Sequence, residues 1–142
     1  MYSFRKSKKG FTLIELMVVV AIIGVLSLLG LRLYTGQQEK AKNAIVKANA
    51  GTAHTLLQAN LADATYTTAA FAVAALTGHG MRNPYTSANL AIESVTATTL
   101  PAASTLAGAV VVCRVSSVPE KYLIGGYDGA KKPVGDTMTA QK

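Results

Sequence analysis

The sequence predicts an α+β protein, in which one long N-terminal helix packs on a small antiparallel β-sheet. The helix is indicated by an apolar run over residues 11–31 and by Ala-rich sequence over residues 32–64, where small and apolar residues recur every three or four positions. The sheet is indicated by short β-branched or aromatic stretches between turn residues, within residues 91–127.

Charge is concentrated at the start of the chain. The 142 residues carry 14 basic and 7 acidic side chains, which gives a formal net charge of +7. Residues 1–9 hold four cations and no acid, so the charge from residue 11 onward is only +3. The basic balance is therefore weak support for a nucleic-acid site. A basic tail before an apolar span predicts that the N-terminus stays cytoplasmic and the C-terminal part is exported.

The apolar run is long enough to cross a membrane. As a helix, residues 11–31 would extend about 31 Å, close to the thickness of a bilayer core. A cleavable secretory signal has a shorter apolar region of about 7–15 residues and a small-residue cleavage site after it. Glu15 is the one charge in the run. We therefore expect a transmembrane segment that remains in the mature protein.

No pattern indicates catalysis, a cofactor or a metal. Cys113 is the single cysteine, so no intramolecular disulfide can form, and we expect it to be a buried apolar residue. His54 and His79 have no partners at metal-ligand spacing. His54 is interpreted as a structural residue, and His79, between two glycines, as a loop residue. Asp128 and Asp136 are too few and too far apart for a calcium loop. The sequence thus favours a structural protein over an enzyme.

The residues KGFTLIEL, from Lys9 to Leu16, precede MVVVAIIGVL and carry a specific resemblance. A short basic leader, a glycine, a phenylalanine and a glutamate four residues later resemble the class III signal of type IV pilins and pseudopilins. The resemblance implies the type IV pilin fold, cleavage between Gly10 and Phe11 by a prepilin peptidase on the cytoplasmic face, and N-methylation of Phe11. It divides the chain into a cleaved leader (1–10), a transmembrane and polymerisation helix (11–31), the amphipathic half of the same helix (32–64) and a globular head (65–142).

Glu15 has two compatible interpretations. Thr12 followed three residues later by Glu15 fits a capping box at a helix start. An acid within an apolar span also requires a partner. The resemblance supplies one, the N-terminal amine of Phe11 on a neighbouring subunit, so that Glu15 and Phe11 act together in assembly.

Gly24 and Gly30 lie within the apolar helix. They either allow close helix packing or, as the resemblance implies, give flexibility to a segment that loses helical structure in a filament. Many family members have a proline near the position of Arg32. This chain has no proline there, so the length of any segment that loses helical structure is left undetermined.

The head is expected to contain a short helix over 68–76, a turn at Arg82-Asn83-Pro84-Tyr85, strands over 91–98, 107–116 and 120–127, and a loop from 128 to 142. Alternation in the second strand predicts Arg114 facing outward and its neighbours of opposite parity facing inward, namely Val111, Cys113 and Val115. The helix face expected to pack on the sheet comprises Ala41, Ile45, Ala48, Thr52, Leu56 and Ala59, widened by Leu57 and Leu61.

The functional prediction is a structural subunit of a type IV pilus filament that supports adhesion, motility or DNA uptake. The family implies self-assembly into a helical homopolymer, with a prepilin peptidase, an assembly platform and an ATPase as partners. The subunit would be held in the inner membrane before it reaches the cell surface. Two alternatives remain open: a pseudopilin of a type II secretion or competence system, and a monomeric membrane-anchored binding protein that keeps its leader.

Overall fold

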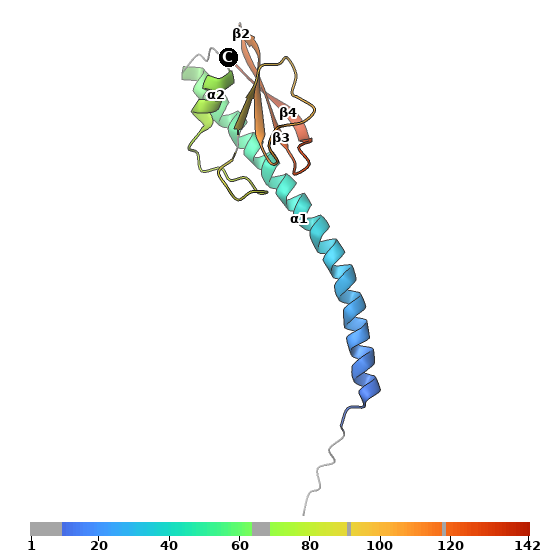
Figure 1. Cartoon of the computed structure of the whole chain (residues 1–142). Coiled ribbons are helices and arrows are strands. Elements are labelled where there is room, and N and C mark those ends of the chain that lie inside the picture. Colours follow the sequence, from blue (N-terminus) through green and yellow to red (C-terminus); the bar gives the residue numbers. More distant parts are fainter. Residues whose placement is uncertain (1–9, 64–68, 91, 118) are drawn as a thin grey trace, which may run out of the picture. The chain divides into compact units, whose positions relative to one another are not determined.

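The computed structural model describes residues 10–63, 69–90, 92–117 and 119–142; residues 1–9 of the predicted leader lie outside them. In chain order the elements are α1 (Leu13–Asp63), α2 (Ala69–Leu76), β1 (Ile92–Val95), β2 (Val110–Ser117), β3 (Glu120–Tyr127) and β4 (Pro133–Gln141) (Figure 1). The predicted α+β class is confirmed, with one long N-terminal helix and a small sheet. The chain divides into two units, Met1–Gln38 and Glu39–Lys142, which we describe separately.

The first unit contains the apolar part of α1. Its large apolar side chains from Leu13 to Leu31 are between 49 and 76 % exposed, on every side of the helix. By length and composition α1 is able to span a membrane over Leu13–Ala62. No Pro interrupts it, and Gly24 and Gly30 lie within regular helix. The first unit therefore has no core of its own and depends on its surroundings to cover this surface.

The second unit, Glu39–Lys142, includes the end of α1 and is called the head from here on. It is built on a four-stranded sheet in the order β1-β2-β3-β4. The antiparallel pairing expected of the sheet is confirmed for β2 and β3. Two expectations were wrong: β1 pairs with β2 in parallel, so the sheet is mixed, and residues 133–141 form an edge strand antiparallel to β3 instead of a loop. β4 lacks a strong sequence signal because most of its side chains are exposed, so no continuous apolar pattern was needed.

β2 is buried on both faces. Val110 and Val112 belong to the core between the sheet and the helices, whereas Val111 and Cys113 belong to a second cluster with Tyr127 on the opposite face. The prediction that Val111 and Cys113 are buried is confirmed. The expectation that only one face of this strand is buried was wrong. Central strands covered on both sides have no need for alternation.

Arg114 lies on the core side of β2, contrary to the predicted outward position. Its guanidinium is 3.6 Å from the carboxylate of Glu120, which is only 5 % exposed. Val115, expected to face inward, is half-buried. The strand pair ends in polar contacts here because a β-bulge shifts the register between Arg114 and Ser116.

The part of α1 that packs on the sheet uses a different face from the predicted one. The buried positions are Val46, Ala50, Ala53, Leu57 and Leu61. Only Leu57 and Leu61 were predicted; Ala48, Thr52 and Ala59 are exposed, and Ile45 is about half exposed. Small residues occur all around this helix, so composition does not distinguish its faces.

Gly126 determines how closely α1 approaches β3. A Cβ atom at this position would lie 2.6 Å from Cγ1 and 3.1 Å from the backbone oxygen of Val46. The helix backbone thus packs directly on the strand, which only a residue without a side chain permits. Further along α1, His54 Nε2 is 2.9 Å from the oxygen of Thr139, so this histidine is structural as predicted.

The predicted turn at residues 82–85 makes hydrogen bonds to Ala107 and, on α1, to Asn43. Asn83 is 3 % exposed; its Oδ1 accepts the backbone N–H of Tyr85 (2.9 Å) and its Nδ2 donates to the oxygen of Ala107 (2.7 Å). The hydroxyl of Tyr85 donates to Asn43 Oδ1 on α1 at 2.6 Å. Gly108, at φ 69°, lies so near that a Cβ would be 2.5 Å from Asn83 Oδ1. A buried amide therefore ties three segments together.

Candidate assembly site at the start of the long helix

The start of α1 is closed by a reciprocal cap between Thr12 and Glu15. The N–H and the hydroxyl of Thr12 both donate to Glu15 Oε2, at 2.9 and 2.7 Å, and the N–H of Glu15 lies 3.4 Å from Thr12 Oγ1. The predicted capping box is confirmed. It satisfies backbone N–H groups that have no partner within the helix and places a negative charge at the positive end of the helix dipole.

Gly10 and Phe11 precede the cap in exposed, non-helical chain. The side chain of Phe11 is 87 % exposed, and apart from the chain neighbours of Gly10 no atom of the described residues lies within 4 Å of the position where Gly10 would have a Cβ. The peptide bond between them is thus extended away from any packed structure. Phe11 and Glu15 lie within about one helical turn of each other on the same chain end.

Glu15 is exposed, and its Oε1 accepts no hydrogen bond from the described residues. The cap therefore uses one oxygen and leaves the other available to a cation. A carboxylate among apolar side chains, with one oxygen unused, is suited to an ion pair formed when the surface around it is covered.

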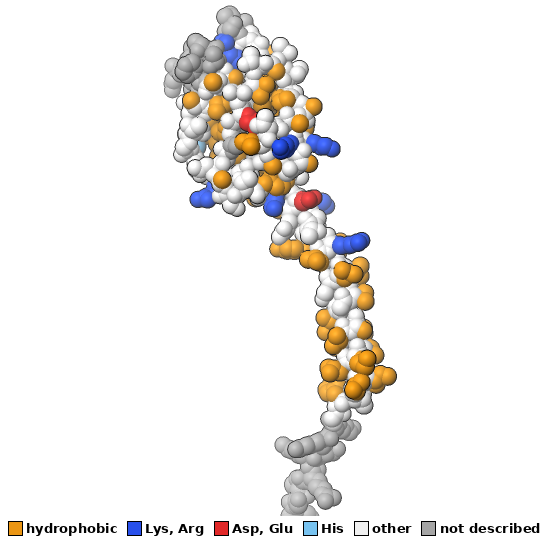
Figure 2. Space-filling model, viewed as in Figure 1, with side chains coloured by type: hydrophobic (Ala, Val, Ile, Leu, Met, Phe, Trp, Pro, Cys, Tyr) orange, Lys and Arg blue, Asp and Glu red, His pale blue; other side chains and the backbone are white. Residues whose placement is uncertain are grey.

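The apolar surface around Glu15 is continuous. Figure 2 shows hydrophobic side chains along the first half of α1 with few charged groups among them. Leu33 and Tyr34, beyond the predicted span of residues 11–31, are also exposed, at 73 and 61 %. Lipid chains or the helices of other subunits are the two environments that would cover such a surface.

Gly24 and Gly30 face open space. Apart from their chain neighbours and the nearby backbone of the helix itself, no atom of the described residues lies within 4 Å of either Cβ position. Within one chain they are therefore not needed for close packing. Their predicted role in helix flexibility remains a proposal.

The rest of the described chain contains no comparable chemical site. No group of three or more His, Cys, Asp or Glu residues with metal-site geometry occurs among the described residues. Cys113 is fully buried, and burial raises the pKa of its thiol. His79 Nε2 lies 3.1 Å from the oxygen of Ala75, at the end of α2, in the loop where it was predicted.

Comparison with known proteins points to the same segment. The profile of the prokaryotic N-terminal methylation motif matches residues 5–31. Fimbrial protein EcpB of Eikenella corrodens is 46 % identical over 55 residues, which cover 39 % of this chain and 35 % of that protein. The chain thus aligns with about a third of the length of this curated relative. No solved structure matches the chain. Together with the α+β fold of a long apolar helix and a small sheet, these matches support the resemblance to type IV pilins: the chain carries an N-terminal methylation motif and is similar over part of its length to a fimbrial protein.

Proposed function

We propose that the protein is a structural subunit of a type IV pilus filament, polymerised through the first half of α1. The observation that carries the proposal is the exposed apolar surface of this helix, with one capped carboxylate at its start, within the methylation motif over residues 5–31. The fimbrial relative supports a filament over a secretion pseudopilus, since its name describes a fimbrial protein.

The proposed sequence of events starts in the inner membrane, where the apolar helix holds the precursor with its N-terminus cytoplasmic. A prepilin peptidase hydrolyses the bond between Gly10 and Phe11, which removes the basic leader and leaves a free amine on Phe11. The same enzyme methylates this amine. The new N-terminus then begins one residue before Thr12, so that its positive charge lies beside the helix start.

Two interactions would drive assembly: an ion pair between subunits and the packing of their apolar helices. The amine of Phe11 on one subunit pairs with the Glu15 carboxylate of another, which neutralises two charges inside an apolar core and fixes the register between helices. Packing helices against each other covers the apolar surface, while the heads form the outside of the fibre. Removing a subunit from lipid requires energy, which an assembly ATPase acting through a membrane platform would supply.

The first experiment is mass spectrometry of surface material sheared from cells that express the native chain. We expect fibres whose subunit begins at N-methylated Phe11. A subunit beginning at Met1 and found only in membranes would overturn the proposal in favour of the anchored binding protein. A processed subunit confined to membranes would replace the pilus with a short pseudopilus.

A further inference from the structure

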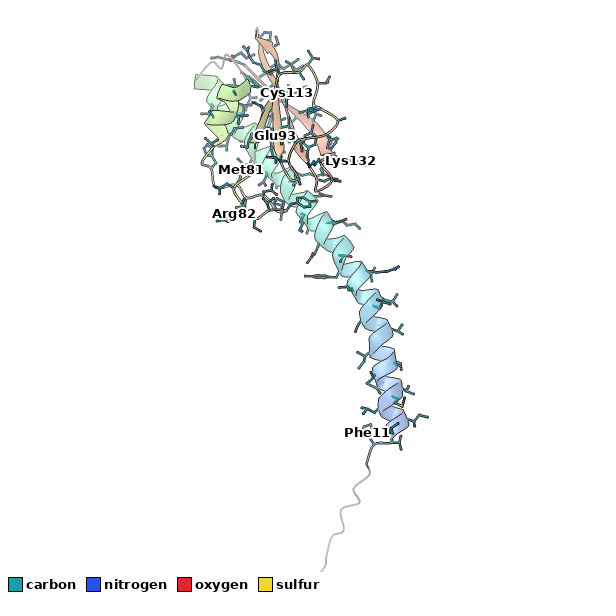
Figure 3. The ribbon with its side chains drawn as sticks, viewed as in Figure 1. Phe11, Met81, Arg82, Glu93, Cys113 and Lys132 are labelled. Atoms are coloured by element: carbon teal, nitrogen blue, oxygen red, sulfur yellow. The ribbon has the colours of Figure 1, made fainter. Side chains whose placement is uncertain are left out.

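The head has a basic end, defined by six cations: Lys40, Lys42, Lys47, Arg82, Lys131 and Lys132. Three segments bring them together where α1 enters the head. Tyr85, from the loop that carries Arg82, donates to Asn43 on α1, and Gly129, in the turn before Lys131, packs against the ring of Tyr85. Gly135 lies against the side chain of Lys47. Arg82 and Lys132 are labelled in Figure 3.

These cations are not neutralised within the head. Glu39, Asp128 and Asp136 are the acids nearest to them in the same segments, yet no carboxylate of the described residues lies within 4.0 Å of any of the six. The carboxylate of Asp128 instead accepts the backbone N–H of Lys132, at 2.9 Å. All six except Lys42 are exposed, and Lys42 lies 5.3 Å from the centre of the Tyr85 ring.

The distribution of charge is uneven. From residue 39 onward the chain has nine basic and six acidic residues, a net charge of +3. The basic end contributes six cations and three acids, which accounts for all of this excess, because the other three cations of the head are matched by three acids. The positive potential of the head therefore belongs to one end of it.

The turn that carries Lys131 and Lys132 is held in a fixed form. Lys131 has φ 65°, where glycine is the favoured residue, and its N–H donates to the oxygen of Asp128 at 3.1 Å. The N–H of Asp128 donates to the oxygen of Lys132 at 2.9 Å. Lys131 thus has a backbone conformation that is unfavourable for a residue with a side chain. The turn exposes the adjacent cations Lys131 and Lys132 to solvent.

We propose that the basic end docks on the anionic phospholipid headgroups of the membrane that holds the subunit before assembly. The chain enters the head at this end directly from the apolar segment, so a subunit anchored by that segment has its basic end next in sequence to the lipid surface. Cations close to an anionic membrane each strengthen binding by about five-fold. After leader removal, Arg32 and the three lysines Lys40, Lys42 and Lys47 are the first side-chain cations that follow the span in sequence. The inference rests on the membrane-held stage of the proposed function.

The test uses the full chain reconstituted in vesicles. An exposed reporter is introduced by Thr86→Cys and labelled with a fluorophore, while Cys113 is fully buried and stays unlabelled in the folded head. Quenching by a nitroxide on the lipid headgroup measures how close the basic end lies to the membrane. We expect stronger quenching in vesicles with about one third phosphatidylglycerol than in phosphatidylcholine alone, and a loss of the difference at high salt.

Paired variants make the test specific. Lys131→Gln with Lys132→Gln should lower the docking equilibrium by roughly 25-fold, five-fold for each charge. Lys121→Gln with Lys142→Gln removes the same charge outside the basic end and should leave quenching unchanged. Equal quenching in both lipids, or equal effects of the two double variants, would overturn docking. Loss of duplex DNA binding by the first variant without a change in quenching would assign the surface to nucleic acid instead.

Insertion is measured separately, by resistance of the vesicle-bound chain to alkaline carbonate extraction. A chain that is extracted contradicts the membrane-held stage, and with it both the proposed function and docking. A chain that inserts but shows no lipid-dependent quenching contradicts docking alone.

Discussion

Thr12 donates two hydrogen bonds to one oxygen of Glu15, from its backbone N–H and from its hydroxyl. The carboxylate is therefore a helix cap within the single subunit and, in our proposal, also the partner of a neighbouring amine. The two roles make different demands on the side chain. Capping needs only an acceptor oxygen, whereas ion pairing needs a negative charge.

Glu15→Gln should separate the two roles. Glutamine keeps the acceptor oxygen of the capping box but carries no charge, so we expect a stable, membrane-inserted subunit with fibre yield reduced at least ten-fold. Thr12→Ala removes the cap, which weakens the helix start by about 1 kcal/mol, but leaves the charge, so fibres should still form. Sheared-fibre yield per unit of membrane subunit is the readout. If Thr12→Ala abolished fibres while Glu15→Gln did not, capping and not charge would be the role of Glu15.

Gly126→Ala should destabilise the head by about 1–3 kcal/mol, since the new methyl would overlap Val46 and its backbone oxygen. Gly51→Ala is the matched control: it lies in regular helix with open space at its Cβ, so it should stabilise by up to about 1 kcal/mol. Urea dependence of Cys113 labelling in detergent reports head unfolding, because this thiol is fully buried in the fold. A neutral Gly126→Ala would show that α1 and β3 are less tightly packed than their contact indicates.

Asn83→Ala should lower the free energy of unfolding of the head by about 2–3 kcal/mol. It removes both polar atoms of a buried amide and leaves the oxygen of Ala107 and the N–H of Tyr85 without these partners. Tyr85→Phe removes a single hydrogen bond to Asn43 and should lower the free energy of unfolding of the head by about 0.5–1.5 kcal/mol. The same labelling assay ranks the two. Equal losses would contradict the central position given to Asn83.

The head should lose stability as the pH rises above 9. Burial raises the pKa of the Cys113 thiol above its ordinary value of 9.0, and burial likewise raises the pKa of Tyr127 above 10.0. When folding raises the pKa of an acid, the acid stabilises the folded state in full at pH values below its pKa in the unfolded chain. This stabilisation is lost as the pH rises from the unfolded pKa through the folded pKa. Urea midpoints followed by circular dichroism should therefore fall from pH 9 upward.

Cys113→Ala is the control for this pH dependence. It should lower stability at neutral pH because a small cavity is left, yet its midpoint should fall less steeply between pH 9 and 10, where Tyr127 is still largely neutral. An unchanged slope would show that the thiol does not titrate in this range.

The sequence predicted the elements that local chemistry specifies. The strand Glu120–Tyr127, the short helix ending at Leu76 and the turn at Asn83 are found where the β-branched, Ala-rich and Asn-Pro signals indicated. β4 was missed because an edge strand packs few side chains, and the parallel pairing of β1 was missed because register between distant segments has no local signal.

What the sequence determined by itself is the functional end of the molecule: the apolar length of α1, the Thr12–Glu15 cap and the motif around Gly10 and Phe11. Hydropathy and capping depend on residues within a few turns of each other, so one stretch of chain specifies them. The tertiary structure decided which face of α1 is buried and gathered the basic end from segments as far apart in the sequence as Lys40 and Lys132. Small residues lie all around that helix, so only the approach of Gly126 and the sheet selected the face that packs.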